Sequence, residues 1–376
     1  MFIQSSLSDK STFFQKLRSL DYIMLLTILI IGIISSFAMY STDGGELRYH
    51  SESHIIRFVV FFTMMIFISF INIKTWHTLG YLFYIIVLGL LIWASLFGIT
   101  AQGSQRWINL YFINLQPSEL MKIAIIICFA KYYHRIQIAH VNRIRNIIIP
   151  ILILIVPIFL VLSQPDLGTS ILIALSGIIV LWLAGVNIKY FFYSSLVLII
   201  SAPFVISFLK PYQKLRILTF FDPDKDPLGA GYQIIQSKIA VGSGGLTGKG
   251  FLKGTQGYLE FLPEKHTDFI FTLFSEEFGF LGSIILLFLY ILLIYRVIIV
   301  GFYVRSFFSK LYCFGFASAI FLYVFVNIAM VLGLIPIVGA PLPIMSYGGS
   351  SMLSIMLGLS IVMSCRIYSQ EQISTY

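Results

Sequence analysis

The chain has 376 residues, of which 58% are hydrophobic and only 11% are charged, and its formal net charge is +9. Its mean hydropathy is +0.93. A soluble domain has about 25% charged residues, so this chain lacks the side chains that a water-facing shell requires. A soluble enzyme, a disordered chain and a coiled coil are therefore excluded, and a polytopic membrane protein remains.

Apolar runs close to the roughly 20 residues that cross a bilayer recur along the whole chain. They predict ten transmembrane helices near residues 22–40, 55–73, 79–98, 118–133, 147–163, 169–186, 190–208, 269–295, 313–335 and 350–366. The polar, basic segment 1–20 shows no small-residue cleavage site, which indicates a retained first helix. We expect residues 1–376 to form one all-α integral membrane domain.

Lys and Arg are distributed unevenly between the two sides of this topology. The termini and the connections on their side carry Lys10, Lys16, Arg18, Lys74, Lys131, Arg135, Arg143, Arg145, Lys189, Arg296, Arg305, Lys310 and Arg366. The short alternate connections carry only Arg48, Arg57 and Arg106. Because basic residues gather on the cytoplasmic side, both termini are predicted to be cytoplasmic. The positive charge is then explained without nucleic acid as a partner.

The connection between the seventh and eighth helices, residues 209–267, is predicted to be a large extracytoplasmic loop. Long loops are uncommon without a function. The stretch Gln233–Val241 predicts a short interfacial helix that carries Lys238. The run GSGGLTGKG, Gly242–Gly250, lacks the first glycine and the final Ser/Thr of a P-loop. It is either a flexible loop or a set of backbone N–H groups that bind an anionic headgroup beside Lys249 and Lys253.

Acidic residues stand at or near the ends of the predicted helices. Asp268 lies where the large loop enters the eighth helix, so it is either a helix-capping residue or a partly desolvated general base. Glu119 and Lys122 are three residues apart on the fourth helix, which indicates an internal ion pair or a cavity lining. Glu276 and Glu277 lie inside the eighth helix and leave the same two alternatives.

The connection Gly333–Ser351 contains three prolines and no charged residue. An apolar segment broken in this way favours a re-entrant or unwound stretch that lines a cavity. The six histidines form no HExxH motif, and we assign no metal ligands from the sequence.

Six motifs follow one another along the chain. They are GSQRWINL (Gly103–Leu110), QPSELMK (Gln116–Lys122), QPDLGTSIL (Gln164–Leu172), FFDPDKDPLGAGYQIIQSKIAVGSGGLTGKG (Phe220–Gly250), GTQGYLEFLPEKHTDFIFTLFSEEFG (Gly254–Gly279) and PLPIMSYGGSS (Pro341–Ser351). In this order they resemble the SEDS family of bacterial shape, elongation, division and sporulation proteins. The form GTQGYLEFLPEKHTDFIF is more similar to the elongation branch than to the division branch.

This resemblance implies a ten-helix SEDS fold in the bacterial cytoplasmic (inner) membrane. It implies a peptidoglycan glycosyltransferase that polymerises lipid II for lateral cell-wall elongation and rod-shape maintenance. The implied partners are a class B penicillin-binding protein and the elongation complex. The family's essential acidic residue matches Asp268, and the Trp of its RW motif matches Trp107. The Glu and Lys of its QPSExxK motif match Glu119 and Lys122.

The expected reaction is a single displacement with inversion, in which Asp268 takes the proton from the acceptor sugar's 4-hydroxyl and undecaprenyl diphosphate leaves. The leaving diphosphate needs cationic stabilisation. The candidates are Arg48, Arg106, Lys122, Arg216, Lys238 and Lys249, together with a divalent cation, Mg²⁺ or Mn²⁺. Trp107, Glu119 and His266 complete the predicted substrate-binding set, and no nucleotide is expected.

Three alternatives stay open beside this prediction. A lipid II flippase would explain the paired charges inside the bundle but not a carboxylate at the outer surface. A division-type polymerase would use the same chemistry. A non-catalytic scaffold for the transpeptidase would tolerate the loss of Asp268.

Overall fold

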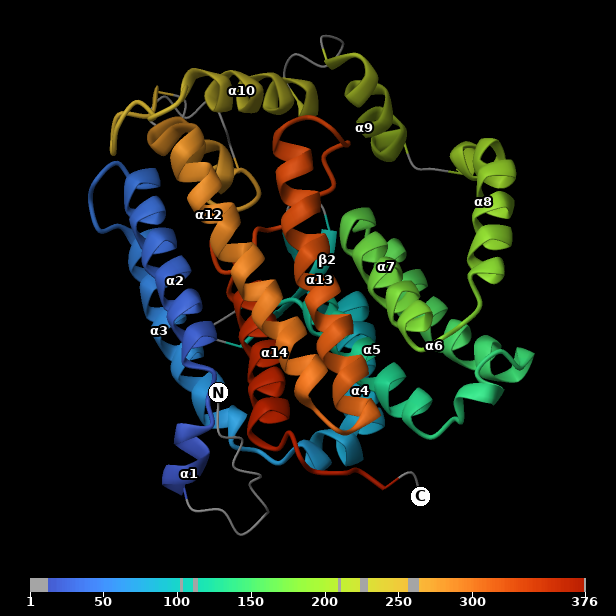
Figure 1. Ribbon diagram of the computed structural model, residues 1–376. Coiled ribbons are helices and arrows are strands. Elements are labelled where there is room, and N and C mark those ends of the chain that lie inside the picture. Colours follow the sequence, from blue (N-terminus) through green and yellow to red (C-terminus); the bar gives the residue numbers. More distant parts are fainter. Residues whose placement is uncertain are drawn as a thin grey trace.

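The structure is a computed structural model that describes residues 13–101, 104–110, 114–208, 211–223, 229–255 and 264–374. Its longer helices, arranged as a bundle in Figure 1, are α2 (Tyr22–Thr42), α3 (Tyr49–Ser69), α4 (Ile73–Phe97), α5 (Pro117–His134), α6 (Ile144–Ser163), α7 (Leu167–Leu183), α8 (Ile188–Phe208), α12 (Ile270–Tyr303), α13 (Phe307–Val331) and α14 (Gly349–Ile367). The shorter ones are α1 (Phe13–Arg18), η1 (Ile138–His140), α9 (Pro211–Phe221) and α10 (Ala230–Ser243).

Every predicted transmembrane segment overlaps one of these ten longer helices, which confirms an all-α multi-pass membrane protein. Seven of them, α2, α3, α4, α6, α12, α13 and α14, are long and apolar enough to cross a bilayer. The apolar helix α7 is shorter, and α5 carries Glu119, Lys122 and Lys131. The number of ten spans therefore stays a prediction.

Helix α3 begins at Tyr49, six residues before the predicted start. Its first turn is polar, so the apolar run did not mark it. Capping explains the earlier start: the backbone N–H of Ser51 donates to Asp43 Oδ2 at 2.8 Å, and the backbone N–H of Arg48 donates to Ser51 Oγ at 3.0 Å. These bonds pair N–H groups that have no partner inside the helix.

A small antiparallel sheet joins α4 to α5 and was not predicted. Its strands are β1 (Ile99–Ala101), β2 (Ser104–Asn109) and β3 (Asn114–Leu115), in the order β1-β2-β3. Strands this short leave little period-two pattern in a sequence. Strand β2 carries Arg106 and Trp107 and packs against α4.

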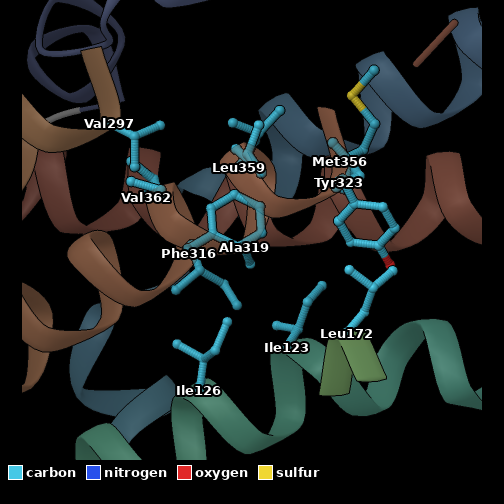
Figure 2. Packing of buried hydrophobic residues seen from close by; sticks show 14 of the residues in the cluster. Ile123, Ile126, Leu172, Val297, Phe316, Ala319, Tyr323, Met356, Leu359 and Val362 are labelled. Carbon is cyan, nitrogen blue, oxygen red and sulfur yellow. The ribbon is translucent and has the colours of Figure 1, made fainter. Parts of the chain in front are cut away.

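Helix α5 lies at the centre of the bundle, and every residue of it except Tyr132 is buried. It packs against α4, α7 and α13. Figure 2 shows Ile123 and Ile126 of α5 facing Phe316 and Ala319 of α13. The charged side chains of α5 are buried with partners: Lys122 pairs with Glu119 at 2.8 Å, and Lys131 Nζ donates to the carbonyl oxygen of Thr78 at 2.7 Å. Such partners offset the cost of burying a charge.

Helix α10 lies across one end of the bundle, while α1 lies at the opposite end (Figure 1). The bundle end beneath α10 is named the α10 end below. The predicted helix Gln233–Val241 is confirmed, because it lies within α10. The large connection is thus partly helical rather than structureless. Its residues 209–210, 224–228 and 256–263 lie outside the described residues.

Candidate active site at the α10 end

Asp268 lies two residues before the first residue of α12 and is half-buried. The N-cap position of that helix is occupied by Phe269, so Asp268 is not the capping residue. Its carboxylate still lies at the positive end of a long helix, where the dipole favours a negative charge. A capping role therefore does not account for this aspartate.

The backbone around Asp268 is fixed by three successive hydrogen bonds. The carbonyl oxygen of His266 accepts from the N–H of Tyr347 at 2.8 Å, that of Thr267 from Ser346 Oγ at 2.6 Å, and that of Asp268 from Asn327 Nδ2 at 2.8 Å. Two of these donors belong to the connection between α13 and α14. A general base benefits from being held in one position in this way.

The connection between α13 and α14 is non-helical from Gly333 to Gly348, as an unwound stretch requires. Ala340, Leu342, Ile344 and Met345 are buried. Gly339 has a φ of +72°, and a Cβ atom on it would lie 3.5 Å from Asp268 Oδ2. This segment therefore packs its backbone against the carboxylate.

A cavity of about 600 Å³ opens at the α10 end, and neither Asp268 nor the segment Gly333–Gly348 is among its described lining residues. The end of α2, the connection to α3, the residues before α12 and the first turns of α12 all contribute to its lining. His266 lines it, as do the acidic residues Asp43, Glu46, Glu276 and Glu277. A pocket of this size matches the volume of small-molecule sites in general.

Three polar side chains meet in this cavity: Asp43 at the end of α2, His50 in the first turn of α3, and His266 before α12. His50 Nδ1 lies 3.5 Å from Asp43 Oδ1, and the rings of His50 and His266 stack with centroids 4.2 Å apart. The sequence analysis did not single out Asp43 or His50. The one available signal is that His50 ends the polar run ELRYH (Glu46–His50), which lies at the same predicted membrane face as Asp268.

Arg106 forms an ion pair at the start of α7. Its Nη1 lies 2.8 Å from Asp166 Oδ2, and Gln116 Nε2 donates to the same oxygen at 3.1 Å. Asp166 Oδ1 meanwhile accepts from the backbone N–H of Thr169 and caps α7. Three of the quoted motifs are joined here, with Trp107 beside Arg106 on β2.

Glu119 and Lys122 form the predicted ion pair, with 2.8 Å between Lys122 Nζ and Glu119 Oε1. Tyr323 of α13 donates its hydroxyl to Glu119 Oε2 at 2.7 Å, and its ring lies 4.1 Å from Lys122 Nζ. Both charged side chains are buried. Neither lines the 600 Å³ cavity, so the described geometry favours the internal pair over the cavity lining.

The glycine-rich run Gly242–Gly250 docks onto α12 instead of lying free. Gly279 has a φ of +64° and interrupts the helix, and the backbone N–H groups of Lys249 and Gly250 donate to the carbonyl oxygens of Glu276 and Glu277 at 3.0 Å each. Lys249 Nζ lies 2.6 Å from Glu276 Oε1. The glycine-rich run thus supplies hydrogen-bond donors to carbonyl oxygens at the kink of α12. Because these two N–H groups are already bonded, they are not available to bind an anion.

The remaining predicted cations are spread apart. Arg48 pairs with Glu46 at 2.9 Å and lines the cavity. Lys238 is exposed on α10. Its side chain lies directly over Gly333, because a Cβ atom added to that glycine would be 2.2 Å from Lys238 Cε. Arg216 belongs to α9, and its side chain lies outside the part of the chain that the structure describes.

The fold and this site define a class: a multi-pass membrane protein with a polar cavity and a fixed carboxylate at one end of its helical bundle. A family model described as cell cycle protein (FtsW, RodA, SpoVE) matches residues 17–371. The chain therefore belongs to this family, the SEDS family.

Known proteins agree with that assignment. The chain is 42% identical to "Peptidoglycan glycosyltransferase MrdB" (RodA) of Escherichia coli strain K12, over 95% of each chain. It is 34% identical to "Probable peptidoglycan glycosyltransferase FtsW" of Wigglesworthia glossinidia brevipalpis, over 91% of each. A solved structure titled "Structural coordination of polymerization and crosslinking by a peptidoglycan synthase complex" matches with a TM-score of 0.79 at 28% identity, covering 92% of this chain and 97% of that one.

Proposed function

We propose that Asp268 is the general base of a peptidoglycan glycosyltransferase reaction at the α10 end of the bundle. The activity class is that of the relatives: the chain is a peptidoglycan glycosyltransferase, as MrdB is named at 42% identity. The observation that supports the assignment of Asp268 is its fixed backbone two residues after His266, which lines the cavity of about 600 Å³.

The substrate is lipid II, which carries its own leaving group, so no nucleotide is required. Asp268 accepts the proton of the acceptor's 4-hydroxyl while that oxygen attacks the donor's anomeric carbon. The bond from the anomeric carbon to the diphosphate breaks, and undecaprenyl diphosphate departs with inversion. General-base catalysis of this kind contributes about 10²–10⁴ to a rate.

Negative charge develops on the leaving diphosphate, and cationic side chains at the α10 end stabilise it. Arg48 and Lys238 are suited to this role, because both side chains are exposed at the α10 end. Lys249 and Arg106 already have carboxylate partners, Glu276 and Asp166. Both of these partners are buried, so Lys249 and Arg106 are better suited to holding the site together than to binding phosphate. Arg48 also has a partner, Glu46, but that pair is exposed and therefore weak.

The cellular setting follows from the relatives. Identity to MrdB exceeds identity to FtsW, 42% against 34%, which favours the elongation branch over a division-type polymerase. The synthase complex that matches in structure couples polymerisation to crosslinking, by its title. We therefore assign a class B penicillin-binding protein as partner, the bacterial cytoplasmic membrane as location, and the cytoplasm as the side of both termini.

The test is glycan-strand formation from purified lipid II in the presence of the cognate transpeptidase. Asp268→Asn keeps the shape of the side chain and removes its basicity, so the rate should fall by about 10²–10⁴ while the thermal unfolding curve stays that of the wild type. Ser318→Ala is the matched control, because the hydroxyl of Ser318 donates to the carbonyl oxygen of Phe314 in the same helix, α13. Polymer formation by Asp268→Asn at a near-normal rate would remove Asp268 from this role, and a translocation assay for lipid II would then come next.

A further inference from the structure

The cluster of Asp43, His50 and His266 has the composition of a metal site. One ring nitrogen from each histidine and one carboxylate oxygen lie within 4.8 Å of one another. The 3.5 Å between His50 Nδ1 and Asp43 Oδ1 is long for a hydrogen bond. It is close to the roughly 3 Å that separates neighbouring ligands when each bond to the ion is about 2.0–2.2 Å.

The hydrogen bonds around His266 select its tautomer. The hydroxyl of Thr42 has one proton, and its Oγ1 lies 2.7 Å from the carbonyl oxygen of Met39, to which it donates. In this arrangement Thr42 Oγ1, 2.9 Å from His266 Nδ1, is the acceptor of the Nδ1–H of His266. The lone pair of His266 is therefore on Nε2. Metal-binding histidines are normally held by such a bond at the other nitrogen.

The charge of the cavity also favours a cation. Its described lining has four acidic residues, Asp43, Glu46, Glu276 and Glu277, against two basic ones, Arg48 and Lys265. Glu46 and Glu276 are paired with Arg48 and Lys249, so Asp43 and Glu277 carry the acidic character that remains. The chain as a whole has a formal charge of +9. An acidic cavity in a basic protein concentrates cations at that place.

One rearrangement is needed. The two imidazole rings lie nearly parallel, at 12°, and parallel stacked rings cannot both direct an in-plane lone pair at one ion. His266 is fixed by Thr42, while the side chain of His50 is 42% exposed. His50 is thus the ring that can turn out of the stack towards Asp43.

We propose that Asp43, His50 and His266 bind one divalent transition-metal ion such as Mn²⁺. Imidazole nitrogens suit such ions, whereas Mg²⁺ prefers oxygen ligands and keeps much of its water. Three protein ligands leave coordination positions open for oxygens of a substrate. The catalytic role of the site rests on the proposed function: a bound ion neutralises charge on a leaving diphosphate. His266 and Asp268 are two residues apart, which brings the ion near the general base.

Binding of Mn²⁺ alone tests the site without any lipid II. The full-length protein in nanodiscs is stripped with a chelator and titrated with Mn²⁺, and the loss of the free-ion electron paramagnetic resonance signal is followed. We expect one ion per chain in the wild type and at least about ten-fold weaker binding in His50→Ala and in Asp43→Asn. Asn at position 43 can still accept from the N–H of Ser51, so the start of α3 is retained.

Glu46→Gln is the matched control, because it removes an acidic group from the same cavity but not from the cluster. It should leave affinity for Mn²⁺ within about three-fold, since an exposed charge acts through screened electrostatics only. Equal weakening by Glu46→Gln and His50→Ala, or no binding to the wild type, would overturn the site. Asp268→Asn should bind Mn²⁺ normally, so failure of the general base and failure of the metal site are separate results.

Discussion

The carbonyl oxygen of Asp268 and the amide of Asn327 are joined by a hydrogen bond of 2.8 Å, although 59 residues separate them in the chain. The same amide also donates to the carbonyl oxygen of Ala340 at 2.7 Å. One fully buried side chain of α13 therefore ties the segment before α12 to the segment before α14. The position of the proposed base depends on this connection.

Asn327→Leu should separate these two segments. It keeps the approximate volume but removes the donor of two carbonyl oxygens, the buried one of Ala340 and the part-buried one of Asp268. An unsatisfied buried acceptor costs about 1–3 kcal/mol, which outweighs the removal of Asn327 Oδ1, itself buried without a described partner. We expect a lower melting temperature and a kcat that falls more than KM changes, because Asp268 is displaced while substrate binding elsewhere is retained. Ser318→Ala on the same helix is the control. Unchanged kcat in a folded Asn327→Leu variant would show that Asn327 does not position the base.

Lys122→Met should be strongly destabilising, by about 3–5 kcal/mol, because it leaves the buried Glu119 carboxylate without its cation. The double variant Glu119→Gln, Lys122→Met removes both charges and should recover most of that stability. Thermal unfolding and polymerisation are measured together on all three proteins. A double variant that folds but stays inactive would show that Lys122 contacts the substrate. Recovery of activity together with stability would show that the Glu119–Lys122 pair is structural.

Gly279→Ala should detach the glycine-rich run from α12. The residue has a φ of +64°, and a Cβ atom on it would lie 2.3 Å from the backbone nitrogen of Gly248. A strained conformation of this kind costs about 1–3 kcal/mol. Limited proteolysis should then cut within Gly242–Gly250 faster than in the wild type. Gly89→Ala, where a Cβ atom meets nothing within 4 Å on α4, should leave the cleavage rate unchanged.

Glu276→Gln distinguishes polymerase from flippase. Glu276 Oε1 accepts from Lys249 Nζ at 2.6 Å and from the backbone N–H of Thr255 at 2.9 Å, so its charge is already used inside the fold. We expect a lower melting temperature but a smaller loss of polymerisation than in Asp268→Asn. Glu52→Gln, an exposed change on α3, controls for charge alone. A loss of lipid II translocation in Glu276→Gln, larger than any loss in Asp268→Asn, would instead favour transport.

Local sequence patterns determined the helices and part of the site. Apolar runs predicted a segment overlapping each of the ten longer helices, because hydropathy is a property of consecutive residues. They missed the start of α3 and the strands β1–β3, where polar residues or very short elements carry the structure. The spacing of Glu119 and Lys122 predicted their ion pair, since residues three apart share a helix face.

Relations between distant segments were decided only by the tertiary structure. His50 in the first turn of α3 stacks on His266 in the segment before α12, and no local pattern places two such distant segments side by side. The glycine-rich run looked like a flexible loop or an anion site until the kink at Gly279 supplied carbonyl oxygens for its N–H groups. The sequence by itself identified Asp268 as the candidate general base. Its fixed position required Asn327, Ser346 and Tyr347, because hydrogen bonds between segments form only once the helices have packed.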